Sequence, residues 1–75
     1  MEIDKAFGEV LKQKRVHNSI SQEELAYLSN LDRTFISMLE RGKRQSSLKT
    51  IFVLADALET LPSQLISEVE KKLKL

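Results

Sequence analysis

Hydrophobic residues recur along most of the chain at the three- and four-residue spacings of amphipathic helices, and no segment predicts a strand. Near the N-terminus one apolar stripe is formed by Ile3, Phe7, Val10 and Leu11. This stripe predicts a helix from about Asp4 to His17, with Asn18 and Ser19 ending it.

Residues 22–42 predict two short helices joined by a tight turn. Ala26 is small where these helices would cross, and Asn30 stands in the turn, where a positive φ is needed and Asn tolerates it. Small or apolar residues fall at Leu25, Ala26, Leu31, Ile36 and Leu39, with polar residues between them. The arrangement is that of a helix-turn-helix, whose second helix usually enters the major groove of DNA.

The predicted ends of these two helices carry local signals. Ser21 and Glu24 have the spacing of a capping box, in which the serine hydroxyl accepts from the Glu24 N–H and the glutamate reaches back. Asp32 is a favourable N-cap for the second helix, and Gly42 is the expected left-handed residue after it.

Two more helices are predicted, one after Ser47 and one from Pro62, whose missing N–H has no consequence in a first turn. We expect the fourth helix to bury Leu48, Ile51, Phe52, Ala55 and Leu58, and the fifth to carry Leu65, Ile66, Val69 and Leu73 on one face. Tyr27, on the second helix, is expected to pack within the protein, with contact between its hydroxyl and DNA as the alternative. The sequence therefore predicts one all-α domain over residues 1–75, a compact bundle of five helices.

Composition limits the other classes of site. With 75 residues the chain is near the small end of what folds unaided, so we expect helix packing to be supplemented by a partner subunit. There is no cysteine for a disulfide or a thiolate metal site, and the lone His17 cannot build a zinc site. No stretch is long and apolar enough to span a membrane and no signal peptide is recognisable, so a cytoplasmic protein is expected.

Charge is unevenly distributed, although the formal net charge is only +1. Between residues 33 and 49 five basic residues stand against one acid, so the segment carries 5 − 1 = +4. These bases are Arg33, Arg41, Lys43, Arg44 and Lys49, and a second basic cluster at the end of the first helix comprises Lys12, Lys14 and Arg15. A basic face that coincides with a helix-turn-helix is what binding to a phosphate backbone requires.

The run SQEELAYLSNLDRTFISMLERGKR, with the Ser-Leu pair at residues 47–48, resembles the XRE (Cro/phage-repressor-like) helix-turn-helix family. The likeness covers roughly residues 5–66, and RTFISMLERGKRQSSL is most similar to restriction–modification controller proteins. The resemblance implies a lambda-repressor-like fold and a transcriptional regulator, an activator or a repressor. It also implies that a homodimer binds double-stranded DNA at an inverted-repeat operator, without a cofactor or a small-molecule ligand.

Candidate base-reading residues lie early in the third helix, because side chains near the N-terminus of a recognition helix reach base edges. Arg33 and Thr34 occupy the first turn, and Ser37 follows one turn later on the same side. Arg33 can donate two hydrogen bonds to a guanine or lie on a phosphate, and Thr34 can contact a base or remain solvated.

Candidate phosphate contacts lie on either side of the recognition helix. The resemblance assigns a DNA-contacting glutamine to Gln22, where the N-terminus of the second helix can meet a phosphate. Lys43 and Arg44 should follow the DNA backbone, and Ser46 and Ser47 could donate to a phosphate. For Ser47 the alternative is a capping role at the fourth helix.

The resemblance also implies a structural ion pair between Arg15 and Glu40, which would explain an acid beside the basic face. The chain departs from the family at three places. Asn30 and Glu59 stand where Gly is frequent, and Gln45-Ser46 replaces a frequent Asn-Pro.

A dimer is expected because one module of this size buries only about 600–1,000 Å² against DNA. Residues 62–75 are predicted to form a dimerisation helix, with an apolar patch of Leu61, Leu65, Ile66, Val69 and Leu73. In the alternative, this stripe belongs to the core of one chain.

A different class of function, a protein-interaction module such as the antitoxin half of a toxin–antitoxin pair, uses the same fold. An enzyme is not expected, because the chain lacks a Cys nucleophile and a phosphate-binding Gly-rich loop, and nothing orients its single His.

Overall fold

The computed structural model describes all 75 residues, which form five helices and no strand. The helices are α1 (Ile3–His17), α2 (Gln22–Ser29), α3 (Arg33–Glu40), α4 (Leu48–Ala57) and α5 (Pro62–Leu73). The prediction of an all-α chain with five helices is confirmed.

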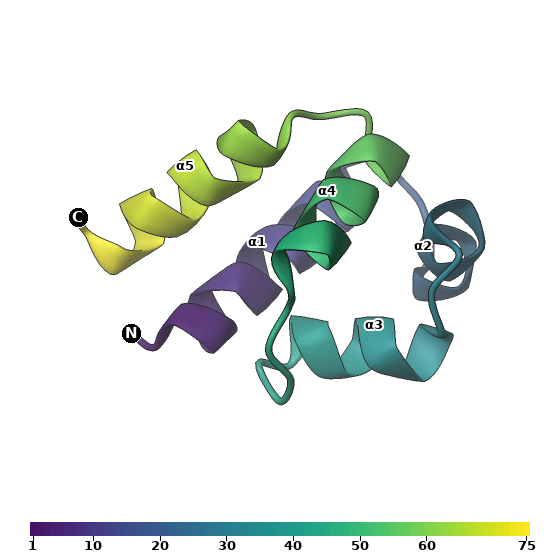
Figure 1. The fold of residues 1–75 in the computed structure, drawn as a ribbon, viewed down its shortest axis with the longest axis horizontal. Helices are drawn as coiled ribbons and strands as arrows, with labels where there is room; N and C mark the ends of the chain where they lie inside the picture. The colour runs from purple at the N-terminus through teal and green to yellow at the C-terminus, as the bar shows by residue number, and fades with distance from the viewer.

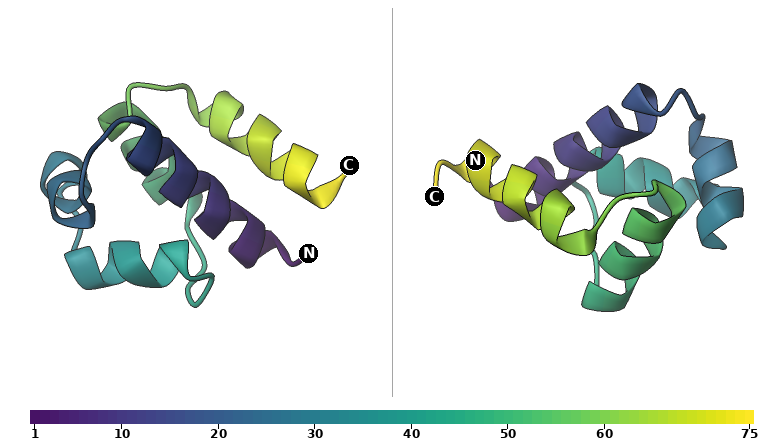
Figure 2. Two further views of the ribbon diagram at one scale, coloured as in Figure 1. Left: turned by 180° about the vertical axis from the view of Figure 1, so that it is seen from behind. Right: turned by 90° about the horizontal axis from the view of Figure 1, so that it is seen from above.

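The longest helix, α1, passes through the middle of the molecule and packs against both α5 and α3 (Figure 1). On the other side, α2 contacts α3 and α4, and α4 contacts α5. The two chain termini lie at the same end of the molecule (Figure 2). The result is a bundle of 32 × 23 × 22 Å in which α3 lies along one edge.

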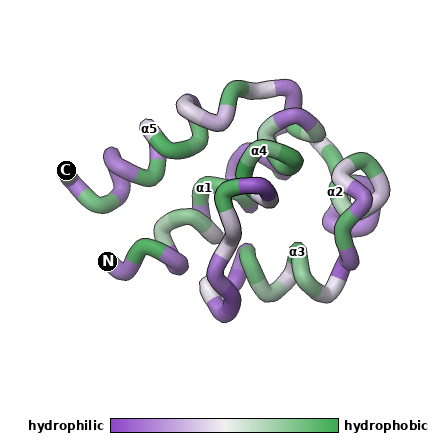
Figure 3. Tube along the Cα trace, in the orientation of Figure 1, coloured by the Kyte–Doolittle hydropathy of each residue, from purple (hydrophilic) through white to green (hydrophobic).

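One core holds the helices together, and every helix contributes to it. In Figure 3 the loop that follows α3 is hydrophilic, in contrast to the hydrophobic turns of α1 and α4. The buried hydrophobic residues are Ala6, Phe7, Val10, Leu11, Leu25, Ala26, Ile36, Leu39, Leu54, Ala55, Leu58, Leu65 and Val69. Burial of these side chains is the main force that orients α3.

The predicted helix starts are confirmed by hydrogen bonds. The Ser21 hydroxyl accepts from the Glu24 N–H at 3.0 Å, and Asp32 accepts from the Thr34 N–H at 3.1 Å. Only this half of the predicted capping box forms, since no bond joins the Glu24 carboxylate to the Ser21 N–H. Because such bonds reach only two or three residues, they are readable from local sequence.

Two helix ends have the left-handed backbone that the sequence predicts. Asn30 has a φ of 56° and ends α2, and Gly42 has a φ of 70° just after α3. Glu59, which follows α4, also has a φ of 56°. Glu59 therefore takes the conformation that glycine would adopt with less strain.

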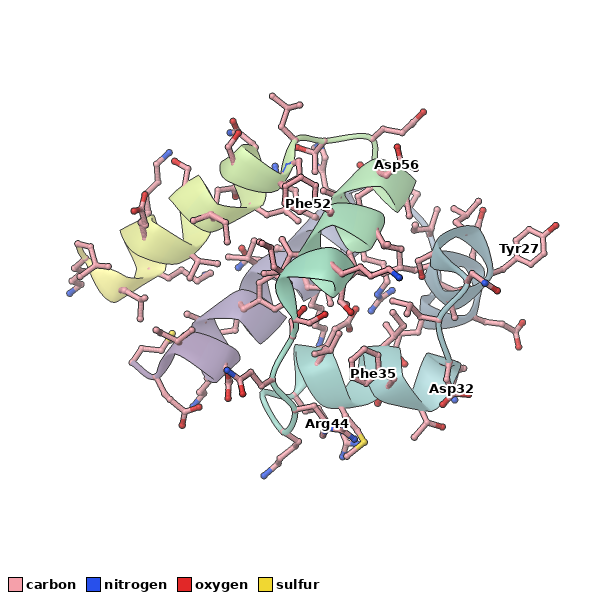
Figure 4. All side chains as sticks on the ribbon, viewed as in Figure 1. Tyr27, Asp32, Phe35, Arg44, Phe52 and Asp56 are labelled. Atoms are coloured by element: carbon pink, nitrogen blue, oxygen red, sulfur yellow. The ribbon has the colours of Figure 1, made fainter.

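Several predicted inward-facing residues are exposed, and these predictions were wrong. Ile3 lies at the free N-terminal end of α1, and Leu48 and Phe52 of α4 point to solvent, with Phe52 56% exposed. Tyr27 projects from α2 and is 84% exposed (Figure 4). The three- and four-residue spacings define a stripe, but a stripe can be wider than the contact that covers it.

None of the five helices is long and apolar enough to cross a bilayer.

Candidate nucleic-acid interface

The outer side of α3 carries predicted site residues on an open surface. No helix covers it in Figure 1, and Arg33 and Thr34 in its first turn are both exposed. Ser37, one turn later, is half-buried. Ile36 and Leu39 anchor the opposite side of α3 in the core, so the polar side of the helix faces outward.

The basic residues around α3 have no acidic partners. Between residues 33 and 49 the only acid, Glu40, is paired with Arg15 of α1, so it neutralises none of them. The five exposed bases that take part in no ion pair are Arg33, Arg41, Lys43, Arg44 and Lys49. Such a concentration of unpaired positive charge is suited to phosphate.

The second basic cluster predicted from the sequence is largely neutralised by the fold. The Lys14 ammonium lies 2.7 Å from a carboxylate oxygen of Glu68 on α5, and Arg15 is paired with Glu40. Of this cluster only Lys12 stays without an ion pair, whereas all five bases between residues 33 and 49 do.

The ion pair that the resemblance implies is formed, and it joins α1 to the end of α3. Arg15 donates from Nε to Glu40 Oε2 at 2.6 Å and from Nη2 to Oε1 at 3.0 Å, and Nη1 donates to the Ile20 carbonyl at 2.9 Å. The Glu40 side chain is only 2% exposed. Two parallel bonds between a guanidinium and a carboxylate make this a geometrically specific connection.

Hydrogen bonding of the Arg15 guanidinium to the Glu40 carboxylate raises the pKa of Arg15, burial opposes this rise, and the negative charge of Glu40 adds to it. Because its pKa is raised, the charge of Arg15 contributes fully to stability below the unfolded-state pKa of arginine. That contribution would be lost only as the pH rises through the still higher folded-state pKa. We therefore expect the pair to be insensitive to pH in the physiological range.

Gln22 occupies the first position of α2, as the phosphate-contact prediction requires, but its side chain also has a partner within the chain. Its Nε2 donates to Glu40 Oε1 at 3.0 Å. Spacing along the sequence gave no indication of this bond, because it joins residues 18 positions apart. The bond orients the amide and leaves the second Nε2 hydrogen available to an outside acceptor.

The loop between α3 and α4 holds the other predicted contacts. Lys43 and Arg44 are exposed, and Ser46 is half-buried with its hydroxyl donating to the Ser47 carbonyl at 3.2 Å. Ser47 caps α4 by accepting from the Thr50 N–H at 3.1 Å, and its hydroxyl donates to the Thr50 hydroxyl at 3.0 Å. The two serine hydroxyls are thus engaged within the chain, whereas the two basic side chains are free of hydrogen bonds.

Sequence reasoning did not single out two features of this surface. Arg41, just past the end of α3, is exposed and donates from Nε to the Ser37 carbonyl at 3.3 Å. The guanidinium of Arg44 lies over the ring of Phe35, with Cζ 5.5 Å from the ring centroid (Figure 4). The sequence places Arg41 at the end of α3, but only the folded chain shows that Arg44 lies over the Phe35 ring.

The predicted dimer patch divides into two groups. Leu65 and Val69 are buried in the core of the chain and Leu73 packs against it, so these residues leave little surface for a partner. Leu61 is 67% exposed and Ile66 is 39% exposed. The interface prediction therefore needs correction, because most of the apolar face of α5 covers α1 and α4.

Comparison with known proteins places this geometry in context. A helix-turn-helix family model matches residues 11–65, which contain most of the surface described above. The chain is 39% identical over 67 residues to control protein C.SmaI of Serratia marcescens, an alignment that covers 89% of this chain and 80% of the relative.

Solved structures give the same picture. The restriction–modification controller protein C.AhdI of Aeromonas hydrophila is 44% identical, with a TM-score of 0.81 over 83% of this chain and 94% of that one. The controller protein C.Esp1396I, solved as a tetramer with its natural 35-base-pair operator, is 34% identical with a TM-score of 0.80 over 92% of this chain and 96% of that one.

Proposed function

We propose that this chain, which belongs to the helix-turn-helix family and within it to the control proteins, is a transcription regulator that binds a specific site on double-stranded DNA. The observation that carries the proposal is the exposed pair Arg33 and Thr34 at the start of α3, near basic side chains without acidic partners. Such a regulator acts in the cytoplasm by binding, and no catalytic step is required.

Arg33 and Thr34 are the proposed base-reading residues. Both lie in the first turn of α3, and neither makes a side-chain bond within the chain, so their polar atoms are free for base edges in the major groove. Arg33 would donate to O6 and N7 of a guanine. Ser37 extends the same side of α3 but is less accessible.

Phosphate contacts would hold α3 in register on either side. The backbone N–H groups at the start of α2 and the second amide hydrogen of Gln22 form one contact, and Lys43 and Arg44 form the other. The Ser46 and Ser47 hydroxyls already donate within the chain, so each would have to turn away from its present acceptor to donate to a phosphate.

We propose a homodimer as the binding form, through exposed apolar residues and not through the buried face of α5. These residues lie on α4, on α5 and in the loop joining them, and comprise Leu48, Phe52, Leu61 and Ile66. The relative C.Esp1396I assembles on its operator as a tetramer, which supports an assembly of more than one chain here. Two-fold pairing would present two α3 helices to half-sites about one helical turn apart.

Selection from a random duplex DNA library with the purified protein tests the proposal. We expect enrichment of an inverted repeat whose half-sites are centred about ten base pairs apart. A folded protein that enriches no duplex sequence would contradict sequence-specific binding and would favour the protein-interaction module instead.

Two alanine variants then separate base reading from phosphate contact. Arg33→Ala should weaken binding to the selected duplex by about 10- to 100-fold and binding to unrelated DNA much less, because a bidentate guanine contact discriminates by about 1–3 kcal/mol. Lys43→Ala, the matched control, should weaken both duplexes alike and reduce the slope of log K against log salt by about 0.9. If Arg33→Ala weakens binding to the selected and the unrelated duplex equally, Arg33 contacts a phosphate and not a base.

A further inference from the structure

The loop after α3 carries an arginine whose charged end rests on the recognition helix. Arg44 makes no hydrogen bond and no ion pair within the chain, yet its guanidinium carbon lies 5.5 Å from the centre of the Phe35 ring. A cation within about 6 Å of a ring centroid is attracted by the electron-rich face of the ring. Figure 4 shows Phe35 on α3 and Arg44 on the neighbouring loop.

The ring that receives Arg44 is itself held in place. Phe35 is partly buried and packs against the core cluster, and it lies between the first-turn residues of α3 and the anchoring Ile36. A ring fixed by the core is a rigid support, whereas the loop residues 43–45 are all exposed. The position of the Arg44 guanidinium is therefore set by α3 as well as by its own loop.

Stacking leaves the donors of an arginine free. The guanidinium presents its five N–H groups around the edge of its plane, so contact with a ring through one face does not consume them. An arginine kept beside α3 has also lost part of its rotamer freedom before DNA arrives, which lowers the entropy cost of binding. The donors of Arg44 thus add to the surface that Arg33 and Thr34 form.

We infer that Phe35 is a positioning residue for DNA binding: its ring holds Arg44 against the side of α3, so that a loop arginine acts as a fixed part of the recognition surface. This inference rests on the proposed function, because it concerns the same DNA-binding surface. It assigns a role to a residue that neither charge nor exposure singles out.

A double-mutant cycle measures the dependence of one residue on the other. Phe35→Leu removes the ring but keeps an apolar side chain, and should weaken binding to the selected duplex about two- to fivefold, as expected for an exposed cation–π contact. Phe35→Tyr, which keeps the ring, should bind as the unaltered protein does. In an Arg44→Ala background, Phe35→Leu should have no further effect.

Two results of this cycle would overturn the inference. If Phe35→Leu weakens binding equally with and without Arg44, Phe35 acts only through the packing of α3. If Phe35→Tyr weakens binding as much as Phe35→Leu does, the aromatic ring is not what matters. Thermal melts of each variant show whether it is folded at the temperature of the binding measurements.

Proton NMR of the unaltered protein without DNA provides a test that needs no variant. The Arg44 side-chain protons should be shifted upfield by the ring current of Phe35, whereas those of Arg33 should have ordinary values. Arg44 protons with the same shifts as those of Arg33 would refute the positioning role, even if the protein binds DNA. If the Arg44 protons are shifted upfield as expected but the protein selects no duplex, the proposed function is refuted instead.

Discussion

Four non-glycine residues of this chain, Ser19, Asn30, Glu59 and Lys74, have a left-handed backbone, and the first three lie between helices. Asn30 ends α2 and Glu59 follows α4, both with a φ of 56°. Asn tolerates this region because its short amide can bond locally, whereas for Glu the Cβ is crowded against the carbonyl. Asn30 could be placed in a turn from its residue type alone, but Glu59 carries no such signal.

Replacing Glu59 by Gly should stabilise the protein by about 0.5–1 kcal/mol. Relief of the left-handed strain, about 1–2 kcal/mol, exceeds the added entropy of Gly in the unfolded chain, about 0.5–1 kcal/mol. Urea denaturation measures the change, and Asn30→Gly is the matched control, with a smaller gain expected. Equal gains at both sites would contradict the assigned strain.

At the scale of the helices, α1 approaches the end of α3 closely at Gly8. A Cβ added at Gly8 would lie 2.3 Å from the Leu39 carbonyl oxygen and 2.7 Å from that of Glu40. Gly8 is within a helix and needs no unusual φ, so its small size serves this contact alone. About two turns further along α1, Arg15 fixes the same end of α3 through its ion pair with Glu40.

Gly8→Ala should therefore destabilise the protein, although alanine favours helices. Overpacking against rigid backbone costs about 1–3 kcal/mol, and the gain in helix propensity offsets about 1 kcal/mol of it. We expect a net loss of up to about 2 kcal/mol in urea denaturation. Lys12→Ala, at an exposed position of the same helix, should change stability by less than about 0.5 kcal/mol. A stabilised Gly8→Ala variant would show that α1 and α3 are further apart.

For the whole molecule, the main correction concerns which apolar residues remain available to a partner. Leu65 and Val69 were assigned to a dimer interface because α5 is amphipathic, but that face is already covered by the core. Phe52 was assigned to the inner face of α4, yet it is more than half exposed. The proposed dimer surface therefore moves toward α4 and the loop before α5.

Phe52→Glu should reduce dimerisation in analytical ultracentrifugation and leave the melting temperature of the separated chain nearly unchanged. Burying a carboxylate in an apolar interface is unfavourable, whereas an exposed position tolerates it. Val16→Glu, at a similarly exposed apolar position of α1, is the control and should dimerise normally. By contrast, Val69→Asp should unfold the chain. A dimer that persists in Phe52→Glu would place the interface elsewhere.

The sequence alone determined the number and type of the helices, the capping roles of Ser21, Asp32 and Ser47, and the left-handed residues Asn30 and Gly42. These features depend on hydrogen bonds and backbone preferences that extend over at most four residues, so local sequence contains them. The excess of basic residues between residues 33 and 49 could likewise be counted from the sequence.

Only the tertiary structure decided which side chains meet across the helices. The bond from Gln22 to Glu40, the stacking of Arg44 on Phe35 and the contact of Gly8 with α3 depend on how each helix is rotated and crossed. Crossing and rotation are set by the packing of the whole core, since side chains from several helices must fill one volume. Periodicity identifies an apolar face, but this packing decides how much of it is covered and how much is left for a partner.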